Sequence, residues 1–302
     1  MTQIQHFYDE RTNTLTYVVY RPETKDAIVV DPVLDYDPAA SKTWTESVDA
    51  VLRFLKEHGL QLKMILETHA HADHLSGAPR LKKAYPEAVV GIGRRITEVQ
   101  RLFRQIFDLP ADFATDGSQF DRLFEDGETF HVDGMEIRVM YTPGHTPACA
   151  SYLIDGQYLF TGDTLFQPDQ GTGRCDFPGG SADDLYTSVH ERLYQLPDEI
   201  IVYPGHDYQP EGREVQYQAP LSAHKQGNVM LNQADTREAF VKRRQTRDAT
   251  LSAPKLLFQS VQVNIDAGRL PEPSATSGKR YLKIPINAFR PEPQGEMTIE
   301  GV

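Results

Sequence analysis

The N-terminal half of the chain alternates short apolar runs with stretches in which apolar residues recur at helical spacing. The apolar runs, which predict strands, lie at 15–20, 27–30, 62–66 and 89–92. The helical patterns lie at 45–58, 78–85 and 96–107. The polar turn at 22–25 suits an antiparallel connection between its flanking strands. This half therefore predicts β-structure covered by helices.

The segment from 128 to 199 has the pattern of consecutive hairpins. Its predicted strands lie at 129–132, 137–141, 151–154 and 158–161. The turns Asp133-Gly134 and Asp155-Gly156 suit tight hairpin connections. A helix is expected over 182–194 and a strand over 199–203. Two β-rich segments, each with helices to cover it, predict an α/β fold of two sheets packed face to face with helices outside.

The character of the chain changes beyond Pro220. A strongly charged helix is expected to begin with a cap from Asp235 and Glu238 and to extend through 247, and a second is expected from Pro254 to near 268. The proline-rich tail from 270 predicts irregular structure. We expect one catalytic domain over 1–220 and, packed on it, a helical extension with an irregular tail over 221–302.

Composition and charge narrow the class of protein. The chain has 302 residues, of which 39% are hydrophobic and 25% charged, which is typical of a globular protein with a substantial core. Its net charge of -12 disfavours a nucleic-acid-binding surface. We expect a cytoplasmic protein without a membrane partner, because no apolar run is long enough to span a bilayer and the start lacks a signal-peptide pattern. Two cysteines, Cys149 and Cys175, are too few for a disulfide scaffold.

Metal-binding side chains follow four of the predicted strands. The run after 62–66 contains four of them within six positions, namely His69, His71, Asp73 and His74. His145, Asp163 and His206 each follow another apolar run, in Pro143-Gly144-His145-Thr146, Thr161-Gly162-Asp163-Thr164 and Tyr203-Pro204-Gly205-His206-Asp207. Imidazole and carboxylate suit divalent metals such as zinc and iron. The sequence therefore predicts a metal site built from loops, in which Asp73 and Asp207 either bind metal or orient an imidazole.

The remaining candidates favour structural roles. The other five histidines, His6, His58, His131, His190 and His224, lie in ordinary helix, turn or strand settings, where hydrogen bonding is commoner than ligation. Cys149 enters a predicted strand and suits a buried apolar role. Cys175 neighbours Arg174, whose charge could lower the pKa of the thiol, but a covalent sulfur carrier is the weaker hypothesis. Arg243, Arg244 and Arg247 are expected on a solvated helix face.

The order and spacing of the metal-binding residues resemble the metallo-β-lactamase superfamily, from Asp31 through Tyr208. This resemblance implies an αββα sandwich with the metal at one edge of the two sheets. The segments Gly173-Arg174-Cys175-Asp176-Phe177 and His206-Asp207-Tyr208 are similar to those of persulfide dioxygenases. Glyoxalase II instead has a Gly-Arg-Phe-Phe-Glu type segment and His-Glu-Tyr at these places. The length of the C-terminal part resembles a bacterial branch of the dioxygenases.

The resemblance implies a site with one Fe(2+) per chain, held by His69, His145 and Asp163. The open positions of the ion would accept O2 and the sulfur of glutathione persulfide, and the products would be sulfite and glutathione. Catalytic roles in orienting ligands and polarising water would fall to His71, Asp73, His74 and His206. Arg174 and Tyr208 are candidates for binding the substrate, with a structural salt bridge as the equal alternative for Arg174. A homodimer is also compatible with the resemblance.

The main alternative is a thioester hydrolase of the glyoxalase II type with two zinc ions. Its first ion would be held by His69, His71 and His145, its second by Asp73, His74 and His206, and Asp163 would bridge them. The chain contains every side chain that this arrangement requires. A non-catalytic metal-binding protein is a further alternative, although it would predict missing ligands.

Overall fold

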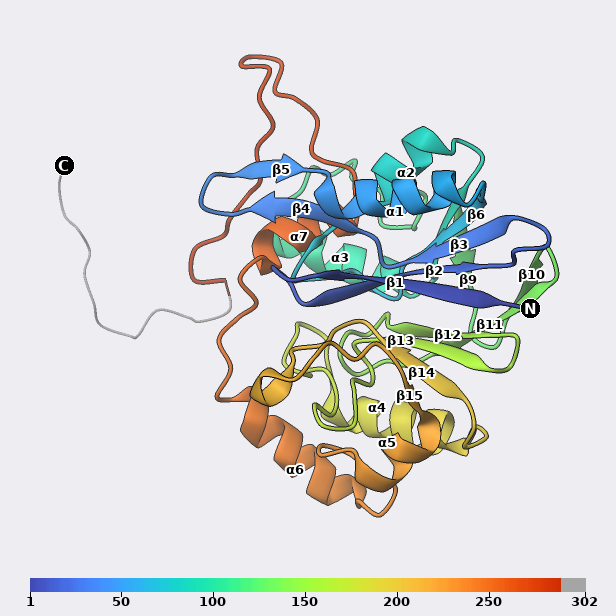
Figure 1. Ribbon diagram of the computed structural model, residues 1–302. Coiled ribbons are helices and arrows are strands. Elements are labelled where there is room, and N and C mark those ends of the chain that lie inside the picture. The colour runs from blue at the N-terminus through green and yellow to red at the C-terminus, as the bar shows by residue number, and fades with distance from the viewer. Residues whose placement is uncertain (289–302) are drawn as a thin grey trace, which may run out of the picture.

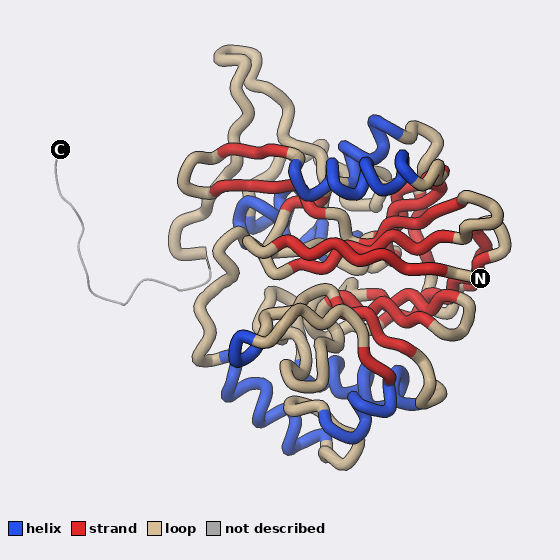
Figure 2. Tube along the Cα trace, in the orientation of Figure 1, coloured by secondary structure: helices blue, strands red, loops and turns tan. Residues whose placement is uncertain are grey.

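The structure is a computed structural model, and it describes residues 1–288. Two six-stranded mixed sheets pack face to face, and helices cover the outer face of each (Figure 1). The separation of strands into two stacked layers is plain in Figure 2. This arrangement confirms the αββα sandwich that the sequence predicts.

The first sheet contains most of the N-terminal strands. Its order is β1 (Gln3–Asp9), β2 (Thr14–Tyr20), β3 (Asp26–Val30), β6 (Gln61–Leu66), β8 (Val89–Gly93) and β9 (Arg122–Phe124). The first three strands are antiparallel, whereas β3, β6, β8 and β9 are parallel. The outer face is covered by α1 (Glu46–Glu57), α2 (Ala78–Ala84), α3 (Ile96–Ile106) and the C-terminal α7 (Leu257–Asn264). The parallel strands therefore end at the same edge of the sheet, where loops can meet.

The second sheet is mainly antiparallel. Its order is β10 (Thr129–Val132), β11 (Met135–Tyr141), β12 (Ala150–Ile154), β13 (Tyr158–Gly162), β14 (Ile201–Pro204) and β15 (Ala219–Pro220), with β13 and β14 parallel. Its outer face is covered by α4 (Ala182–Tyr186), the π-helical turn Thr187–Arg192, the 3-10 turn Leu193–Gln195, α5 (Leu221–Gly227) and α6 (Arg237–Asp248). A 3-10 turn spans Pro210–Gly212.

The apolar core between the sheets is rich in aromatic rings. Tyr17 of β2 packs edge-on against Phe160 of β13 and Tyr203 of β14, with ring centroids 5.3 and 5.4 Å apart. The Tyr17 hydroxyl donates a hydrogen bond to the carbonyl of Pro204, so its one polar group is satisfied where it is buried. These contacts join the two sheets directly beneath the loops that follow β13 and β14.

Several elements differ from the sequence predictions. The predicted helix over 182–194 is interrupted, since only Ala182–Tyr186 is α-helical. The cap of α6 is Thr236, whose hydroxyl accepts from the backbone N–H of Ala239, whereas Asp235 pairs with Arg243. Arg244 is buried in an ion pair and does not lie on a solvated face. The prediction missed β1, α5 and a small sheet made of β5 (Lys42–Trp44), β4 (Val33–Asp37) and β7 (Leu75–Ser76).

Within residues 1–288, no helix combines the length and the apolar character that a membrane crossing requires. The tail from 270 to 288 contains neither helix nor strand, which agrees with the irregular structure expected for that part. The prediction for the remainder of the tail lies outside the described residues.

Candidate metal centre

Loops from both sheets bring the predicted metal-binding residues together. The loop after β6, residues 67–74, carries His69, while His145 lies between β11 and β12 and Asp163 follows β13. One ligand atom from each of these three residues lies within 4.8 Å of the others, and all three side chains are buried. The His145 Nε2 is 3.5 Å from Asp163 Oδ2. Two histidines and a carboxylate therefore form a compact group that a single ion can contact.

Hydrogen bonds fix which nitrogen of each imidazole carries the proton. The His145 Nδ1–H donates to the carbonyl of Arg174 at 2.7 Å. The Thr68 hydroxyl donates to Asp31 and so accepts from the Nδ1–H of His69, at 3.0 Å. Burial, followed by the neighbouring His71 and His145, lowers the pKa of His69 well below the usual value. In both ligands Nε2 therefore keeps its lone pair for a metal ion.

Asp31 and Glu67 surround the outer nitrogen of His71. The His71 Nε2–H donates to Asp31 Oδ1 at 3.0 Å, and Glu67 Oε2 lies 3.4 Å from the same nitrogen. Burial opposes protonation of His71, but the two carboxylates outweigh it and raise its pKa well above the usual value. Burial raises the pKa of Glu67. The Nδ1 atom of His71 is left facing away from these carboxylates, without a hydrogen-bond partner among the described residues.

A second donor group adjoins the first. The His206 Nε2 lies 3.3 Å from Asp73 Oδ2 and 3.4 Å from Asp163 Oδ1, so Asp163 lies between His145 and His206. Asp73 also lies 3.2 Å from Nδ1 of His74. The His206 Nδ1–H donates to the carbonyl of Asn13 at 3.1 Å, which leaves Nε2 as the acceptor. All seven metal-binding side chains that the sequence predicts therefore converge on one place.

The donor atoms fit a metal ion. Buried polar atoms usually have partners, yet five atoms of this cluster have none among the described residues. These atoms are His69 Nε2, His71 Nδ1, His74 Nε2, His206 Nε2 and Asp163 Oδ1. Four imidazole nitrogens and a carboxylate oxygen are the donors that zinc and iron prefer. The arrangement is therefore a metal centre by its own chemistry.

Comparison with known proteins agrees with this geometry. The family model described as the metallo-beta-lactamase superfamily matches residues 10–206. The chain belongs to this superfamily. It is 45% identical to a probable metallo-hydrolase of Burkholderia pseudomallei, over 95% of this chain and 99% of the relative. It is 44% identical to glyoxylase B2 of Dictyostelium discoideum, over 95% of this chain and 98% of the relative.

Likeness to the persulfide dioxygenase branch is present in both sequence and structure. The human mitochondrial persulfide dioxygenase ETHE1 is 32% identical over 68% of each chain. The crystal structure of ETHE1 from Myxococcus xanthus superposes with a TM-score of 0.70 at 30% identity, covering 88% of this chain and 100% of that chain. The superfamily and the fold are thus as the sequence predicts, and ETHE1 agrees with the expected branch.

Two glycines allow the loops of the metal centre to pack closely against neighbouring segments. Gly162, just before Asp163, has a φ of +50°, and a Cβ there would lie 2.4 Å from Oγ1 of Thr68. Gly144, just before His145, has a φ of +142°, and a Cβ there would lie 2.4 Å from Cβ of Leu185. Only glycine combines such backbone angles with so little space. These positions explain why glycine precedes both ligands.

The two predicted substrate-binding residues have different surroundings. Tyr208 is 51% exposed and its ring stacks on that of His206, with ring centroids 5.4 Å apart, so Tyr208 lies at the rim of the metal centre. Arg174 donates to both oxygens of Asp176 at 2.5 and 2.6 Å, and to the carbonyl of Ser252 at 2.7 Å. These contacts use three of the five N–H donors of the guanidinium. The structural salt bridge therefore exists, and two N–H donors of Arg174 have no partner among the described residues.

Other candidates lie outside the donor cluster. Asp207 forms an ion pair with Arg213 at 2.7 Å and accepts from the backbone N–H of Gln216, so it supports the loop after β14. Burial raises the pKa of Cys149 to about 12 and raises the pKa of Cys175 further. Both thiols are free, buried and protonated at neutral pH, as expected for structural cysteines.

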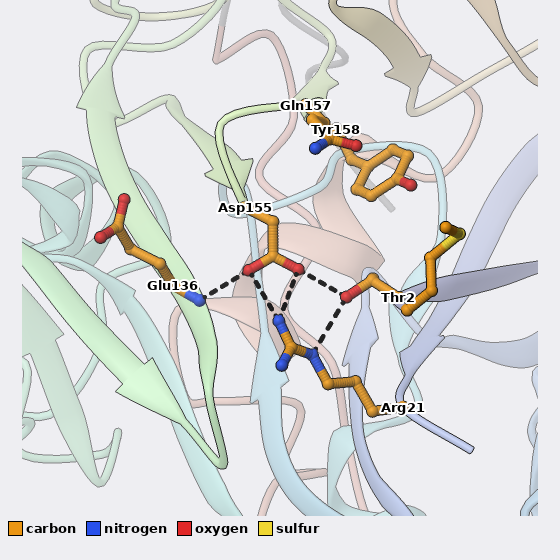
Figure 3. Close-up of a pocket in the computed structure, with 7 residues that line it drawn as sticks. Thr2, Arg21, Glu136, Asp155, Gln157 and Tyr158 are labelled. Carbon is orange, nitrogen blue, oxygen red and sulfur yellow. Dashed lines mark hydrogen bonds and ion pairs between the residues drawn. The ribbon is translucent and has the colours of Figure 1, made fainter. Parts of the chain in front are cut away.

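A polar pocket of about 390 Å³ is lined by Arg21, which follows the end of β2 opposite the metal centre. Figure 3 shows the residues that line this pocket. Its Arg21 forms an ion pair with Asp155 at 3.1 Å, and Asp155 also accepts from Thr2 and from the backbone N–H of Glu136. Arg21 and Asp155 satisfy each other, whereas the Glu136 carboxylate points away from them in Figure 3 and lies 3.7 Å from His131.

Sequence reasoning missed several residues that support the centre. Asp31 follows a predicted strand just as the metal ligands do, so the same signal could have identified it. Glu67 immediately precedes the histidine run and could have been included with it. Asn264 hydrogen-bonds the loop that carries His71 and His74, but nothing in the sequence of α7 distinguishes it.

Proposed function

We propose that this metallo-beta-lactamase superfamily enzyme is a persulfide dioxygenase that converts glutathione persulfide, O2 and water into glutathione and sulfite. The observation that carries the proposal is the buried group of His69, His145 and Asp163, whose ligand atoms lie within 4.8 Å of one another. Two histidines and one carboxylate form the facial triad of non-haem Fe(II) oxygenases. Likeness to ETHE1 in sequence and in structure supports the same reaction.

The chain's own residues would hold one Fe(2+) and orient the substrate. When bound, iron supplies redox chemistry and open coordination positions for a sulfur anion and O2. The sulfane sulfur is oxidised by four electrons as O2 is reduced, and water supplies the third oxygen of sulfite. Thr68 and the Arg174 carbonyl hold His69 and His145 with Nε2 free, which keeps the ligands ready for the metal.

Further residues would act on the substrate around the ion. The buried His74 and His206 and the half-buried Asp73 form a polar wall, and the proposal gives them and His71 the roles of orienting groups and polarising water. The rim position of Tyr208 allows its hydroxyl to hydrogen-bond the peptide-like carrier. The two unused N–H donors of Arg174 suit a carboxylate of the same carrier.

Oxygen consumption with elemental analysis tests the proposal. Protein purified without oxygen and loaded with Fe(II) should contain about one iron per chain, consume O2 with glutathione persulfide and release sulfite. A His145→Ala variant should lose both iron and oxygen uptake, whereas His71→Ala should lose turnover more than iron. Native active protein with two zinc ions and no oxygen uptake would refute the proposal.

A second candidate function is hydrolysis of a glutathione thioester at two metal ions. The second donor group favours it, because the buried Nε2 atoms of His74 and His206 lack partners among the described residues and Asp163 lies between two histidines. The name of the Dictyostelium relative, glyoxylase B2, points the same way. Hydrolysis of S-lactoylglutathione by the two-zinc protein, without oxygen uptake, would establish this candidate in place of the dioxygenase.

A further inference from the structure

The two C-terminal helices α6 and α7 contact the loops that carry the metal-binding side chains. We propose that the C-terminal extension is a clamp that positions the metal ligands, with Asn264 of α7 and the Arg244–Asp248 pair of α6 as its positioning residues. The clamp rests on the metal centre of the proposed function, but it holds for the dioxygenase and for the hydrolase alike.

Asn264 engages the histidine loop through all parts of its amide. Its Nδ2 donates to the backbone carbonyls of His71 and His74, both at 2.8 Å, and its Oδ1 accepts from the backbone N–H of Ser76 at 2.8 Å. The side chain is only 4% exposed, so water cannot replace these bonds readily. A residue some 190 positions along the chain therefore sets the backbone of the loop that carries four metal-binding side chains.

The contact made by Asn264 continues to an imidazole. The Ser76 hydroxyl donates to Glu67, and the other carboxylate oxygen of Glu67 lies 3.4 Å from Nε2 of His71. The carbonyl of His71 in turn accepts from Asn264, so three hydrogen bonds and the Glu67–His71 ion pair form a closed ring around the loop. Because each member is buried, a shift of the loop would leave buried polar groups unpaired.

The Arg244–Asp248 pair holds the second ligand loop. These side chains are 2.6 Å apart, and both residues are buried. Arg244 donates to the carbonyl of Thr172 at 3.2 Å, and Asp248 accepts from the backbone N–H of Cys175 at 2.9 Å. Between these two points lies the carbonyl of Arg174, which accepts from Nδ1–H of His145. The pair therefore positions the group that orients a metal ligand.

One continuous segment connects the two halves of the clamp. Figure 1 shows the chain passing from α6, beside the second sheet, to α7, beside the first. On the way the carbonyl of Ser252 accepts from the Arg174 side chain at 2.7 Å. The extension thus contacts ligand loops of both sheets and ties them together.

Isosteric variants with matched controls test the α7 contact. Asn264→Asp keeps the acceptor for Ser76 but replaces the NH2 group, with its two N–H donors, by one carboxylate oxygen that faces two carbonyl oxygens. Gln262→Glu makes the same change on the same helix, where the Gln262 amide bonds the backbone of Phe258 and Lys283. Apo full-length protein is titrated with Co(2+) against a chelator, and the visible spectrum of the bound ion is recorded. We expect Asn264→Asp to lose about 10- to 100-fold in affinity with an altered spectrum, and Gln262→Glu to stay within about twofold of the parent.

The α6 contact is tested in the same way. Asp248→Asn removes the charge that pairs with Arg244, and Asp235→Asn is its control, because Asp235 forms an ion pair with Arg243 of the same helix and contacts no metal ligand. We expect Asp248→Asn to lower Co(2+) affinity by about tenfold or more, and the control to leave it within about twofold.

Two results would overturn the clamp. One is parent-like affinity and spectrum in both Asn264→Asp and Asp248→Asn, and the other is an equal loss in the controls, which would indicate general destabilisation. If Asn264→Asp does not fold, Asn264→Ala gives the same comparison without the added charge. Cobalt binding needs no turnover, so failure of the oxygen assay would refute the proposed reaction and leave the clamp standing.

Discussion

Asp31 controls the proton positions of two imidazoles, so Asp31→Asn should disable the metal centre without changing its shape. Asp31 Oδ1 accepts from the backbone N–H of Thr68 and from Nε2–H of His71, while Oδ2 accepts from the Thr68 hydroxyl. In Asp31→Asn, the amide oxygen can still accept from Thr68 N–H and His71 Nε2–H, but the NH2 group then faces the Thr68 hydroxyl. That hydroxyl must then donate elsewhere, and His69 Nδ1 at 3.0 Å is its neighbour. A proton would move to Nε2 of His69, the atom that a metal needs.

The size of the effect follows from the lost hydrogen bonds. A hydrogen bond to a charged group contributes about 1.5–3 kcal/mol. Without the Asp31 carboxylate, the buried side chains of Thr68 and His69 must change their hydrogen bonds. Because about 1.4 kcal/mol corresponds to a tenfold change, iron affinity should fall by about 10- to 100-fold. The backbone of Asp31 has a φ of +49°, which asparagine tolerates well, so the substitution adds little strain.

Iron titration of the apo protein and oxygen uptake at saturating Fe(II) measure this prediction. Asp35→Asn is the matched control, since Asp35 is also buried and accepts from the backbone N–H and hydroxyl of Ser47 and from Arg11. Both variants should lose similar thermal stability, but only Asp31→Asn should lose iron affinity. Parent-like iron binding in Asp31→Asn would show that the Asp31–Thr68–His69 relay does not set the tautomer.

Three further predictions concern packing, thiol burial and pH. Gly162→Ala should lower the free energy of unfolding by roughly 1–3 kcal/mol and reduce metal content, because the new Cβ would meet Thr68 at 2.4 Å; chemical unfolding with metal analysis checks this. Iodoacetamide applied to the native enzyme should leave oxygen uptake unchanged, because Cys149 and Cys175 are buried thiols with raised pKa values. Burial lowers the pKa of His224 from 6.5 in the unfolded chain to about 4 in the folded protein. Between these pH values only the unfolded chain binds a proton at His224, so the folded protein loses stability as the pH falls from 6.5 towards 4. The free energy of unfolding, measured in urea at pH 6.5 and at pH 4, should therefore fall by about 3 kcal/mol less in His224→Leu than in the parent. The same fall in both proteins would contradict this prediction.

The metal-binding side chains of the candidate centre were predictable because each lies shortly after an apolar run. Strand ends in one layer meet at an edge, so the positions of His69, His145, Asp163 and His206 could be inferred from strands alone. The strands that precede them, such as β6 and β13, are apolar enough to be recognised, since β13 and the last three residues of β6 are buried on both faces. The same pattern explains why the two-sheet architecture was predicted correctly.

Elements with mixed or little apolar character were not predictable in this way. β1 contains Gln3, Gln5 and His6, and it is only partly buried at the edge of the first sheet, so its pattern is weak. The strands β4 and β5 are short, and most of their residues are only partly buried or exposed. Backbone pairing of β4 with β5 and with β7 stabilises them, and a local apolar pattern does not reveal such pairing. The buried Arg244 differs from its neighbour Arg243 only in its tertiary partner, which local sequence cannot reveal.

The supports of the metal centre show why ligands and their positioning residues differ in predictability. A metal ligand must reach the ion, so in this fold it lies in a loop just after a strand, and the apolar strand before it can be recognised in the sequence. A positioning residue needs only a hydrogen-bonding group at the right place, and Asn264 meets this need from a helix far along the chain. Asp31 does so from the position just after β3, and Asp248 does so from a helix beside the second sheet. Because the positions of Asn264 and Asp248 come from tertiary packing, they become visible only when the two sheets and the C-terminal helices are assembled.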